Sequence, residues 1–377
     1  MKKYKIPLSQ PDITELERRA VLSVLKTPYL SLGPKLKEFE EKTAKEAGVK
    51  YSVAVNSGTS ALHLIVRALG LKKGDEVITT PFSFIASSNC ILFEGAKPVF
   101  VDIEPQTFSI NPDEIEKKIN QRTKAILAVD VFGHPAKWDE ILKVAQKNKL
   151  KVIADSAESL GSEYKGRKCG GFGTASIFSF YPNKQVTTGE GGVVLTNDKK
   201  IADLFQSMTN QGRRIRGGKW LEHIRLGYNY RLDEMSCALG IVQLERLKGT
   251  IKKRERVAQM YGKKLKGVPE VKIPYVAPDV KMSWFVYVIQ LSPEFSFKKR
   301  DKIIEELEKR GIQSRAYFQS IHLQPFYKKL FSFKRGDFPV CEKVSERVIS
   351  LPFYNNLKEK QIDFVVNSLK EIIAKLK

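Results

Sequence analysis

Residues 13–250 alternate short apolar runs with longer amphipathic stretches, and this alternation restricts the fold more than any other feature of the chain. The clearest apolar runs are Ser52–Val55, Glu76–Thr80, Lys97–Asp102, Lys124–Asp130 and Lys151–Asp155. Amphipathic stretches of helical length, such as Ser60–Leu69 and Trp138–Lys147, separate most of them. Near-continuous apolar runs of this kind are typical of buried parallel strands joined by crossover helices. The pattern predicts an α/β domain with a mainly parallel sheet.

The pattern changes after residue 250. A basic helix is expected first, followed by a strand, a charged helix, a short strand and a final amphipathic helix. The corresponding segments are Lys252–Lys266, Ser283–Leu291, Lys299–Arg310, Gln313–Tyr317 and the residues from about Leu357 onward. This order is typical of a smaller α+β unit. We therefore expect a large domain at residues 1–250 and a small C-terminal domain at residues 251–377.

Composition indicates a globular protein of the cytoplasm. The chain has 377 residues, of which 42% are hydrophobic, and no apolar run is long enough to cross a bilayer. The basic N-terminus has no hydrophobic stretch behind it, which argues against a secretory signal. The four cysteines are far apart and form no CxxC pair, so we expect neither a disulfide framework nor a bound metal.

The formal charge of +23 raises the question of a polyanionic partner. The basic residues are dispersed and often lie beside acidic ones, as in KIIEELEKRG, which is typical of solvated helix faces. No aromatic–basic RNA signature or zinc finger is present. We therefore favour a solvated surface over nucleic-acid binding. Steering of a small diphosphate substrate is a third interpretation.

One lysine stands in an uncharged segment. Residues 175–189, ASIFSFYPNKQVTTG, contain Lys184 as their only charged residue, although 28% of the chain is charged. The segment lies between two strand-like runs, and GEGGVVLTN after it indicates a turn and a strand. Burial of a lysine disfavours its ammonium form and exposes a nucleophilic amine that can form a Schiff base. Most lysines are surface residues, but this environment makes Lys184 a candidate for covalent chemistry.

Two other segments could hold parts of a ligand. The sequence NSGTS follows a predicted strand and precedes a predicted helix, and this arrangement can bind a phosphate with free N–H groups. An ordinary helix cap would look the same. Asp155 ends another predicted strand, at the sheet edge where ligands of α/β proteins bind, and could hold a cationic ring nitrogen. A role as helix cap is equally compatible with its position.

Pyridoxal phosphate (PLP) is a ligand that needs all three features. Its aldehyde reacts with a lysine, its pyridine nitrogen pairs with a carboxylate, and its phosphate binds at a helix start. Phe84, in the run PFSF after a predicted strand, could stack on the ring, or it could belong to the core.

At this point the chain strongly resembles the sugar-nucleotide aminotransferases of the DegT/DnrJ/EryC1/StrS family, within the fold-type I PLP enzymes. The resemblance covers nearly the whole chain and includes VNSGTSALHL, GDEVITTPFSFIAS, AKPVFVDI, TKAILAVDVFGHPA, LGYNYRLDEMSCALGIVQL and HLQPFY. It also includes the long run from Asp155 to Asp198 that contains Lys184. It implies a large domain with a mainly parallel seven-stranded sheet flanked by helices.

The resemblance also implies roles for individual residues. Lys184 would form the Schiff base with PLP, and Asp155 would pair with the pyridinium nitrogen. The residues implied to bind the rest of the cofactor are Gly58, Thr59 and Ser179 at the phosphate, Phe84 on the ring and Glu158 near the phenolic oxygen. Position 158 is often His or Gln in this family, although some members have Glu. A carboxylate there is unfavourable unless it is protonated or balanced by another charge.

Two further residues extend the implied site. Asn229, in GYNYR, resembles the residue that the family donates to the phosphate of the neighbouring subunit, which implies a homodimer with a shared active site. His322, in HLQPFY, falls in a segment that family members use near the sugar.

The resemblance implies transfer of an amino group from an amino acid, glutamate by preference, to a nucleotide-linked keto sugar. We expect a 4-keto-6-deoxy sugar, destined for amino-sugar or cell-surface polysaccharide biosynthesis. Family members that remove an oxygen at C3 have His where this chain has Lys184, so transamination is favoured. A 3-keto sugar substrate is one alternative. A regulatory or DNA-binding protein of this fold without transaminase activity is another.

Overall fold

The computed structural model describes residues 4–215 and 217–376, and its largest sheet has seven strands. Their order across the sheet is β1 (Tyr51–Val55), β9 (Gly192–Thr196), β8 (Ala175–Ser179), β5 (Lys151–Asp155), β4 (Thr123–Val129), β2 (Glu76–Thr79) and β3 (Lys97–Phe100). Strand β9 pairs antiparallel with β1 and β8, whereas β8, β5, β4, β2 and β3 run parallel to one another. The predicted mainly parallel seven-stranded sheet is confirmed.

The strands are predominantly apolar, without polar alternation, because the sheet is covered on both faces. Along β1, Val53 and Val55 belong to one buried cluster and Ala54 to another. Likewise, Ile153 and Val152 of β5 belong to different clusters. Since neighbouring side chains of a strand point to opposite faces, burial of both faces removes the polar alternation of a half-exposed strand.

Helices supply the cover. Helices α3 (Gly58–Ala68), α4 (Ala86–Phe93) and α7 (Lys199–Thr209) pack with the cluster that contains Val53. Helices α2 (Pro34–Ala47) and α8 (Glu234–Glu245) pack with the cluster of Ala54, and α6 (Trp138–Lys147) packs with that of Val152. The remaining helices of this part are α1 (Glu15–Leu25), α5 (Pro112–Ile115) and the short 3-10 turns Glu116–Lys118 and Val131–Gly133.

The C-terminal part contains a three-stranded antiparallel sheet in the order β10 (Val271–Lys272), β12 (Tyr287–Leu291) and β13 (Val348–Leu351). Its helices are α10 (Phe297–Lys309), α11 (Pro325–Phe331), α12 (Pro339–Ser345) and α13 (Glu359–Leu376), with a 3-10 turn at Ile321–Leu323. A small sheet joins β11 (Val280–Lys281) to β6 (Glu163–Tyr164) and β7 (Arg167–Lys168) of the preceding part.

Two predicted strands of this part need correction. The strand expected at Ser283–Leu291 begins only at Tyr287, because Trp284 has a left-handed backbone (φ 58°) that interrupts an extended run. The short strand expected at Gln313–Tyr317 is wrong. Arg315 makes an isolated bridge to Ser350, and Ile6 pairs with Ile312, so no continuous ladder forms there.

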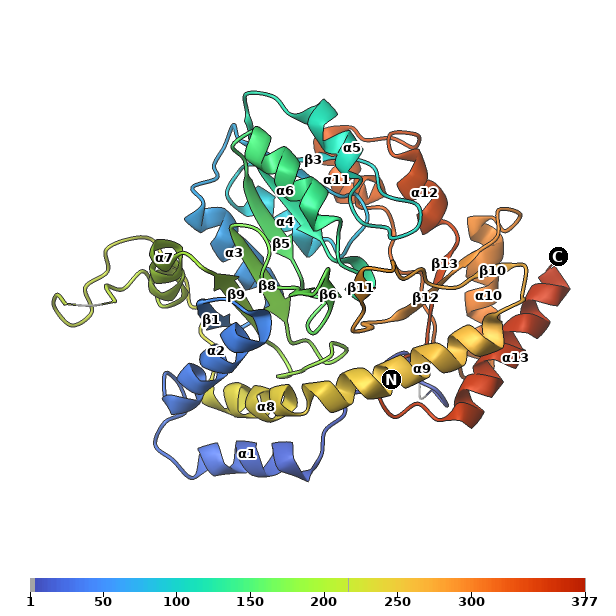
Figure 1. Ribbon diagram of the computed structural model, residues 1–377, viewed down its shortest axis with the longest axis horizontal. Helices are drawn as coiled ribbons and strands as arrows, with labels where there is room; N and C mark the ends of the chain where they lie inside the picture. The colour runs from blue at the N-terminus through green and yellow to red at the C-terminus, as the bar shows by residue number, and fades with distance from the viewer. Residues whose placement is uncertain (1–3, 216, 377) are drawn as a thin grey trace.

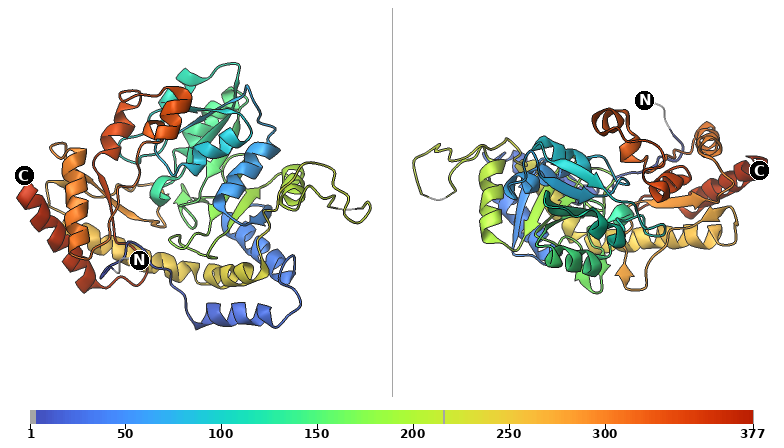
Figure 2. Two further views of the ribbon diagram at one scale, coloured as in Figure 1. Left: turned by 180° about the vertical axis from the view of Figure 1, so that it is seen from behind. Right: turned by 90° about the horizontal axis from the view of Figure 1, so that it is seen from above.

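Helix α9 (Leu247–Leu265) runs without interruption through the expected boundary at residue 250. Figure 1 shows it passing from beneath the large sheet towards α13. Figure 2 shows the C-terminal helices together at one end of the molecule, opposite the loop that projects after α7. We retain residues 1–250 and 251–377 as proposed domains joined by a shared helix.

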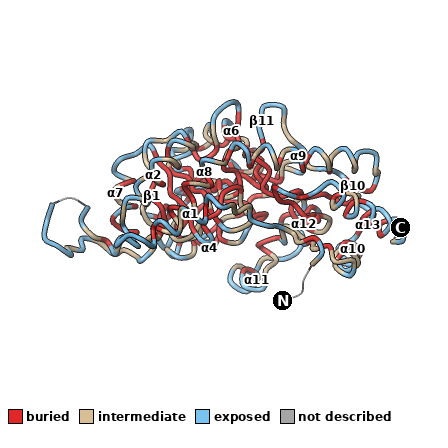
Figure 3. Tube along the Cα trace, turned by 90° about the horizontal axis from the view of Figure 1, so that it is seen from below, coloured by how far each residue is buried: buried red, intermediate tan, exposed pale blue. Residues whose placement is uncertain are grey.

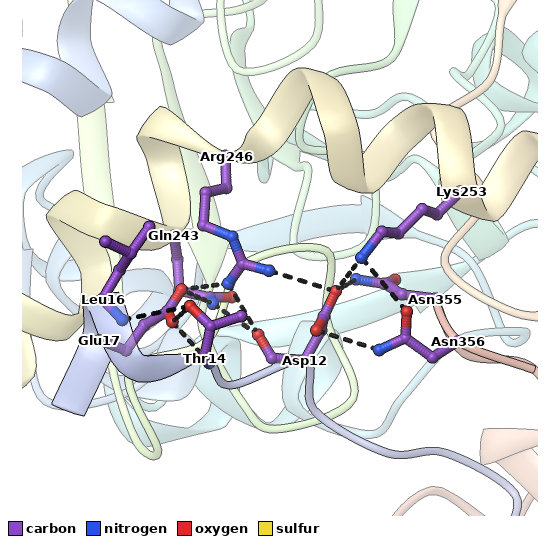
Figure 4. Close-up of polar contacts among 9 residues, drawn as sticks. All are labelled: Asp12, Thr14, Leu16, Glu17, Gln243, Arg246, Lys253, Asn355 and Asn356. Carbon is purple, nitrogen blue, oxygen red and sulfur yellow. Dashed lines mark hydrogen bonds and ion pairs between the residues drawn. The ribbon is translucent and has the colours of Figure 1, made fainter.

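A polar network ties the N-terminal segment to this helix and to the C-terminal part (Figure 4). The Asp12 carboxylate accepts hydrogen bonds from Lys253 (2.8 Å), Asn355 (3.2 Å) and Asn356 (3.0 Å), and Arg246 donates to the Asp12 carbonyl (3.0 Å). Burial by itself raises the pKa of Asp12, but the bonds from Lys253 and the two asparagines outweigh it and lower the pKa to about 2. The first and last thirds of the chain are thus joined through one charged carboxylate.

The buried residues form a continuous band through the centre of the molecule, and the projecting loop is largely exposed (Figure 3). All four cysteines are buried and unpaired. Within residues 4–215 and 217–376, none of the helices combines the length and apolarity that crossing a bilayer requires.

A carboxyl group below the sheet gives a pH-dependent stability. Burial raises the pKa of Glu40, on α2, to about 7, although its carboxylate accepts a hydrogen bond from the Ala54 N–H (2.9 Å). A pKa above the unfolded value means that the folded state binds the proton more tightly, so this group's contribution to stability falls as pH rises from about 4.5 to 7. We expect Glu40→Gln to raise the free energy of unfolding at pH 8 by roughly 1–3 kcal/mol.

Urea denaturation at pH 5 and pH 8 measures the free energy of unfolding of both proteins. The difference between Glu40→Gln and the wild type should be smaller at pH 5 than at pH 8. Glu41→Gln, on the same helix but exposed, removes an equal charge and is the matched control. An equal gain at both pH values would contradict the assignment to Glu40.

Candidate active site

All but two of the predicted residues converge at the edge of the large sheet where its parallel strands end. Lys184 lies in the loop between β8 and β9, Asp155 is the last residue of β5, and Gly58 opens α3 directly after β1. All three line one cavity of about 420 Å³. Phe285 and Tyr317 of the C-terminal part complete its wall.

The Lys184 amine is largely removed from water. Its side chain is 11% exposed, and its Nζ atom lies 3.6 Å from Oε1 of Glu158. The Lys184 Nζ also lies 3.9 Å from the centre of the Phe285 ring. Burial lowers the pKa of Lys184, while Glu158 and Asp155 oppose that shift. A lower pKa increases the neutral, nucleophilic fraction of the amine.

The start of α3 approaches β8 and β9 closely. The Ser57 hydroxyl caps the helix by accepting the Ser60 N–H (3.0 Å), and the N–H groups of Gly58 and Thr59 precede any acceptor within the helix. A Cβ added at Gly58 would lie 3.0 Å from the Cβ of Ser179, and one at Gly192 would lie 2.7 Å from the Ser57 carbonyl oxygen. Glycine at these positions opens a cradle lined by N–H groups and the Ser179 hydroxyl.

Asp155 is 4% exposed, and its carboxylate accepts hydrogen bonds from the Ser87 hydroxyl (2.7 Å) and the Ala157 N–H (3.2 Å). Burial raises the pKa of Asp155, and the Ser87 bond and Lys184 only partly offset it. Ser87, on α4, was missed by the sequence analysis. Its position three residues after Phe84 in the run PFSFIAS was the available signal.

Glu158 is the carboxylate next to the lysine amine, and a backbone N–H group holds it there. Its Oε2 accepts the N–H of Phe132 (2.7 Å), which has a left-handed backbone (φ 60°). Burial raises the pKa of Glu158, and the Lys184 charge counteracts that shift. Two buried carboxylates therefore face one ammonium group.

The aromatic side chains around the cavity come from distant segments. Phe84 lines it with 62% of its surface exposed. Tyr317 and Phe318 line it from the C-terminal part, and the Phe318 ring stacks on Phe132 at 5.3 Å. Tyr317, Phe318 and Phe285 belong to no motif in the sequence, so their presence could only be found from the structure.

The other two predicted residues lie elsewhere. Asn229 is exposed at the base of the projecting loop, where it forms a bridge with Asn210, and it does not line the cavity of its own chain. His322 is not brought to the cavity either. Its ring is fully buried against Phe338 and Phe333, and its Nε2 lies 3.0 Å from Glu342.

The site's own atoms fit PLP. The glycine cradle can take the phosphate, since helix N–H groups favour anions. Asp155 places a buried carboxylate on the cavity wall, where it can pair with a cationic ring nitrogen. Phe84 leaves a broad exposed face to cover a ring.

Comparison with known proteins gives the same identification. The model of the DegT/DnrJ/EryC1/StrS aminotransferase family matches residues 11–370. An uncharacterized protein of Methanocaldococcus jannaschii is 41% identical over 377 residues, covering 98% of each chain. A GDP-perosamine synthase of Escherichia coli O157:H7 is 36% identical over 371 residues, covering 98% of this chain and 99% of that one.

Solved structures agree over the full length. PseC of Helicobacter pylori, an aminotransferase involved in the biosynthesis of pseudoaminic acid, has a TM-score of 0.94 and 33% identity, covering 99% of this chain and 100% of that chain. The Streptococcus pneumoniae protein Spr1654, known in a PLP form and in a form with pyridoxamine phosphate (PMP), has a TM-score of 0.94 and 29% identity in both. The chain therefore belongs to the DegT/DnrJ/EryC1/StrS aminotransferase family, whose members are PLP-dependent sugar aminotransferases.

Proposed function

We propose that this sugar aminotransferase moves an amino group from glutamate to the keto group of a nucleotide-linked 4-keto-6-deoxy sugar in the cytoplasm, for amino-sugar or polysaccharide biosynthesis. One observation carries the proposal: the Lys184 amine, the Asp155 carboxylate and the start of α3 line the same cavity. The similarity to GDP-perosamine synthases favours a nucleotide-linked sugar.

Each residue that lines the cavity has a proposed role that follows from its position. Bound PLP would supply a reversible carrier for the amino group between the two substrates. The N–H groups of Gly58 and Thr59 bind the phosphate together with the Ser179 hydroxyl, and Phe84 covers the ring. Asp155 keeps a proton on the ring nitrogen.

Lys184 moves the protons of the reaction. In its neutral form, Nζ takes the proton from the α-carbon of the amino acid and later returns one to the sugar carbon that bore the keto group. Glu158, beside this amine, would lie near the phenolic oxygen, where burial favours its protonated form over a second negative charge. The wall of Phe285, Tyr317 and Phe318 excludes water from these transfers.

The test has two stages. The purified protein should be yellow, and borohydride should fix the cofactor covalently to Lys184. Incubation with glutamate and a panel of nucleotide-linked 4-keto and 3-keto sugars, scored by mass spectrometry, should give an amino sugar from a 4-keto substrate. If only 3-keto sugars gave an amino sugar, the proposed 4-keto substrate would be wrong. Colourless protein that binds no added PLP would overturn the proposal.

We also propose that the active unit is a homodimer whose sites are shared. Asn229 is exposed and does not line the cavity of its own chain. It forms a bridge with Asn210, and the segment between these two residues belongs to the loop that projects after α7 (Figure 1). In addition, Leu16, Leu22 and Leu25 of α1 are each more than half exposed (57%, 55% and 54%), which favours cover by another chain.

Subunit mixing tests the shared site. Lys184→Ala and Asn229→Ala homodimers should both be impaired. A heterodimer with one variant in each chain should regain about half of the wild-type activity, since one of its two sites then has both native residues. Two different affinity tags allow the heterodimer to be isolated and assayed. Activity no higher than that of the Asn229→Ala homodimer would show that each site uses residues of one chain.

A further inference from the structure

Arg254, on α9, is a buried cation behind the lysine that no motif identified. Its side chain is 3% exposed, and its guanidinium carbon lies 5.5 Å from the centre of the Phe353 ring. Burial lowers the pKa of Arg254 to about 10, with Asp12 opposing the shift. Burying a guanidinium group costs free energy unless its N–H groups donate hydrogen bonds within the protein.

The guanidinium joins two backbone segments that frame the amine. One terminal nitrogen donates to the carbonyls of Asn183 and Lys184, at 3.2 Å each. The other donates to the carbonyls of Trp284 (3.2 Å) and Phe285 (3.3 Å). The first pair belongs to the loop that carries the lysine, and the second to the segment whose Phe285 ring faces Nζ.

A neighbouring side chain reinforces this connection. The Gln185 amide nitrogen donates to the Glu158 carbonyl (2.7 Å) and to the Ser283 hydroxyl (2.8 Å). Residues 183–185 are therefore fixed to residues 283–285 at several points. Only the planar fork of arginine can serve two carbonyls on each side, since a lysine ammonium is a single point donor.

We propose that Arg254 is a positioning residue for Lys184: it fixes the lysine-bearing loop to residues 284 and 285, and so holds Nζ over the Phe285 ring and in front of Glu158. The inference rests on the proposed role of Lys184 as the cofactor lysine. The charged groups that face this amine are Asp155 at the end of β5, Glu158 in the turn that follows, and Arg254 from α9. The Tyr317 phenol lies in the cavity wall. Arg254 is thus the cation that disfavours a second positive charge on Nζ.

Three variants distinguish the positioning of the Lys184 amine from the effect of the Arg254 charge on it. Arg254→Lys keeps a cation but loses the fork, and Arg254→Met loses both. The matched control is Arg300→Lys on α10, because Arg300 is also buried (6% exposed) and donates to two carbonyls, those of Ser345 and Val348, away from the cavity. Melting temperatures of all variants report the general cost of altering a buried arginine.

Two readouts follow the amine itself. In the cofactor-free protein, the acetylation rate of Lys184 against pH, measured by mass spectrometry of its peptide, gives the protonation profile. With added PLP, the rate of capture is measured by absorbance. In this step the neutral amine condenses with the aldehyde and releases water, and borohydride then reduces the carbon–nitrogen double bond to a stable amine.

We expect Arg254→Lys to capture PLP on the order of tenfold more slowly with an unchanged profile. Arg254→Met should also capture PLP slowly, and its acetylation profile for Lys184 should shift to higher pH. Arg300→Lys should match the wild type in the rate of PLP capture and in the acetylation profile. Wild-type capture and profile in both Arg254 variants, or the same defect in Arg300→Lys, would overturn the inference. Failure of borohydride to fix PLP on wild-type Lys184, with the acetylation profile still dependent on Arg254, would instead refute the proposed function alone.

Discussion

Replacing Lys184 by alanine should lower kcat by about 10⁴-fold or more, because the amine that holds the cofactor and moves the protons is removed. The phosphate cradle, Asp155 and Phe84 remain, so the variant should still bind PLP without a covalent bond. Its absorbance should then be that of the free aldehyde, and borohydride should not attach the cofactor to the chain. Steady-state kinetics and mass spectrometry after reduction measure the two effects.

A small primary amine added to Lys184→Ala should restore part of the activity, since it can occupy the space of the missing side chain and accept the same proton. Lys168→Ala is the control, because Lys168 pairs with Glu46 (3.0 Å) outside the cavity. Its kcat should stay within about twofold of the wild type, as expected for an exposed pair. An active Lys184→Ala enzyme without added amine would contradict the assigned role.

Replacing Asp155 by asparagine should have opposite effects on activity and on the stability of the cofactor-free protein. The loss of negative charge removes the group that keeps the ring nitrogen protonated, and kcat/KM should fall on the order of 10²–10³-fold. The fold should tolerate the change. Asparagine can still accept the Ala157 N–H, and the Ser87 hydroxyl can accept a bond from the new amide because it also lies near the Ser83 hydroxyl (2.6 Å) and the Phe84 carbonyl (3.2 Å).

The sign of the stability effect follows from the raised pKa of Asp155. The folded cofactor-free protein binds this proton more tightly than the unfolded chain, so the wild type loses stability as pH rises above the ordinary aspartate range. Without cofactor, Asp155→Asn should therefore have a higher Tm than the wild type at pH 8, and the difference should diminish at acidic pH. With PLP the order should reverse, since only the wild type pairs with the ring nitrogen.

Asp130→Asn is the matched control for a buried aspartate. Asp130 accepts four hydrogen bonds, from the Ala136 N–H, the Trp138 indole and the hydroxyls of Ser156 and Ser159. An amide cannot accept all of them, so this variant should melt at a lower temperature at every pH. A fall in Tm of equal size in Asp155→Asn would show that Asp155 has a structural role instead.

Local signals in the sequence predicted the mainly parallel sheet and the candidate segments at the centre of the site, whereas the seven strands and the individual residue roles came from the family resemblance. Apolar runs without alternation identified strands buried on both faces. The absence of charge around Lys184 reported a buried amine, and the order strand, NSGTS, helix reported a helix start that can bind an anion. These signals depend only on neighbouring residues, so the tertiary arrangement did not need to be known.

The sequence by itself therefore determined the α/β architecture and the family, and it assembled Lys184, Asp155 and Gly58 as parts of one site. Only the tertiary structure decided which distant side chains support them: Ser87 on Asp155, Tyr317 and Phe318 in the wall, and Arg254 behind the lysine. It also placed His322 in the interior and moved the start of the expected strand to Tyr287, beyond the left-handed backbone of Trp284. The physical reason is that hydrophobic periodicity and local charge indicate the secondary structure and the burial of a segment. A contact between residues that are 70 positions apart, such as Arg254 and Lys184, depends instead on how the packed helices and strands bring two segments together.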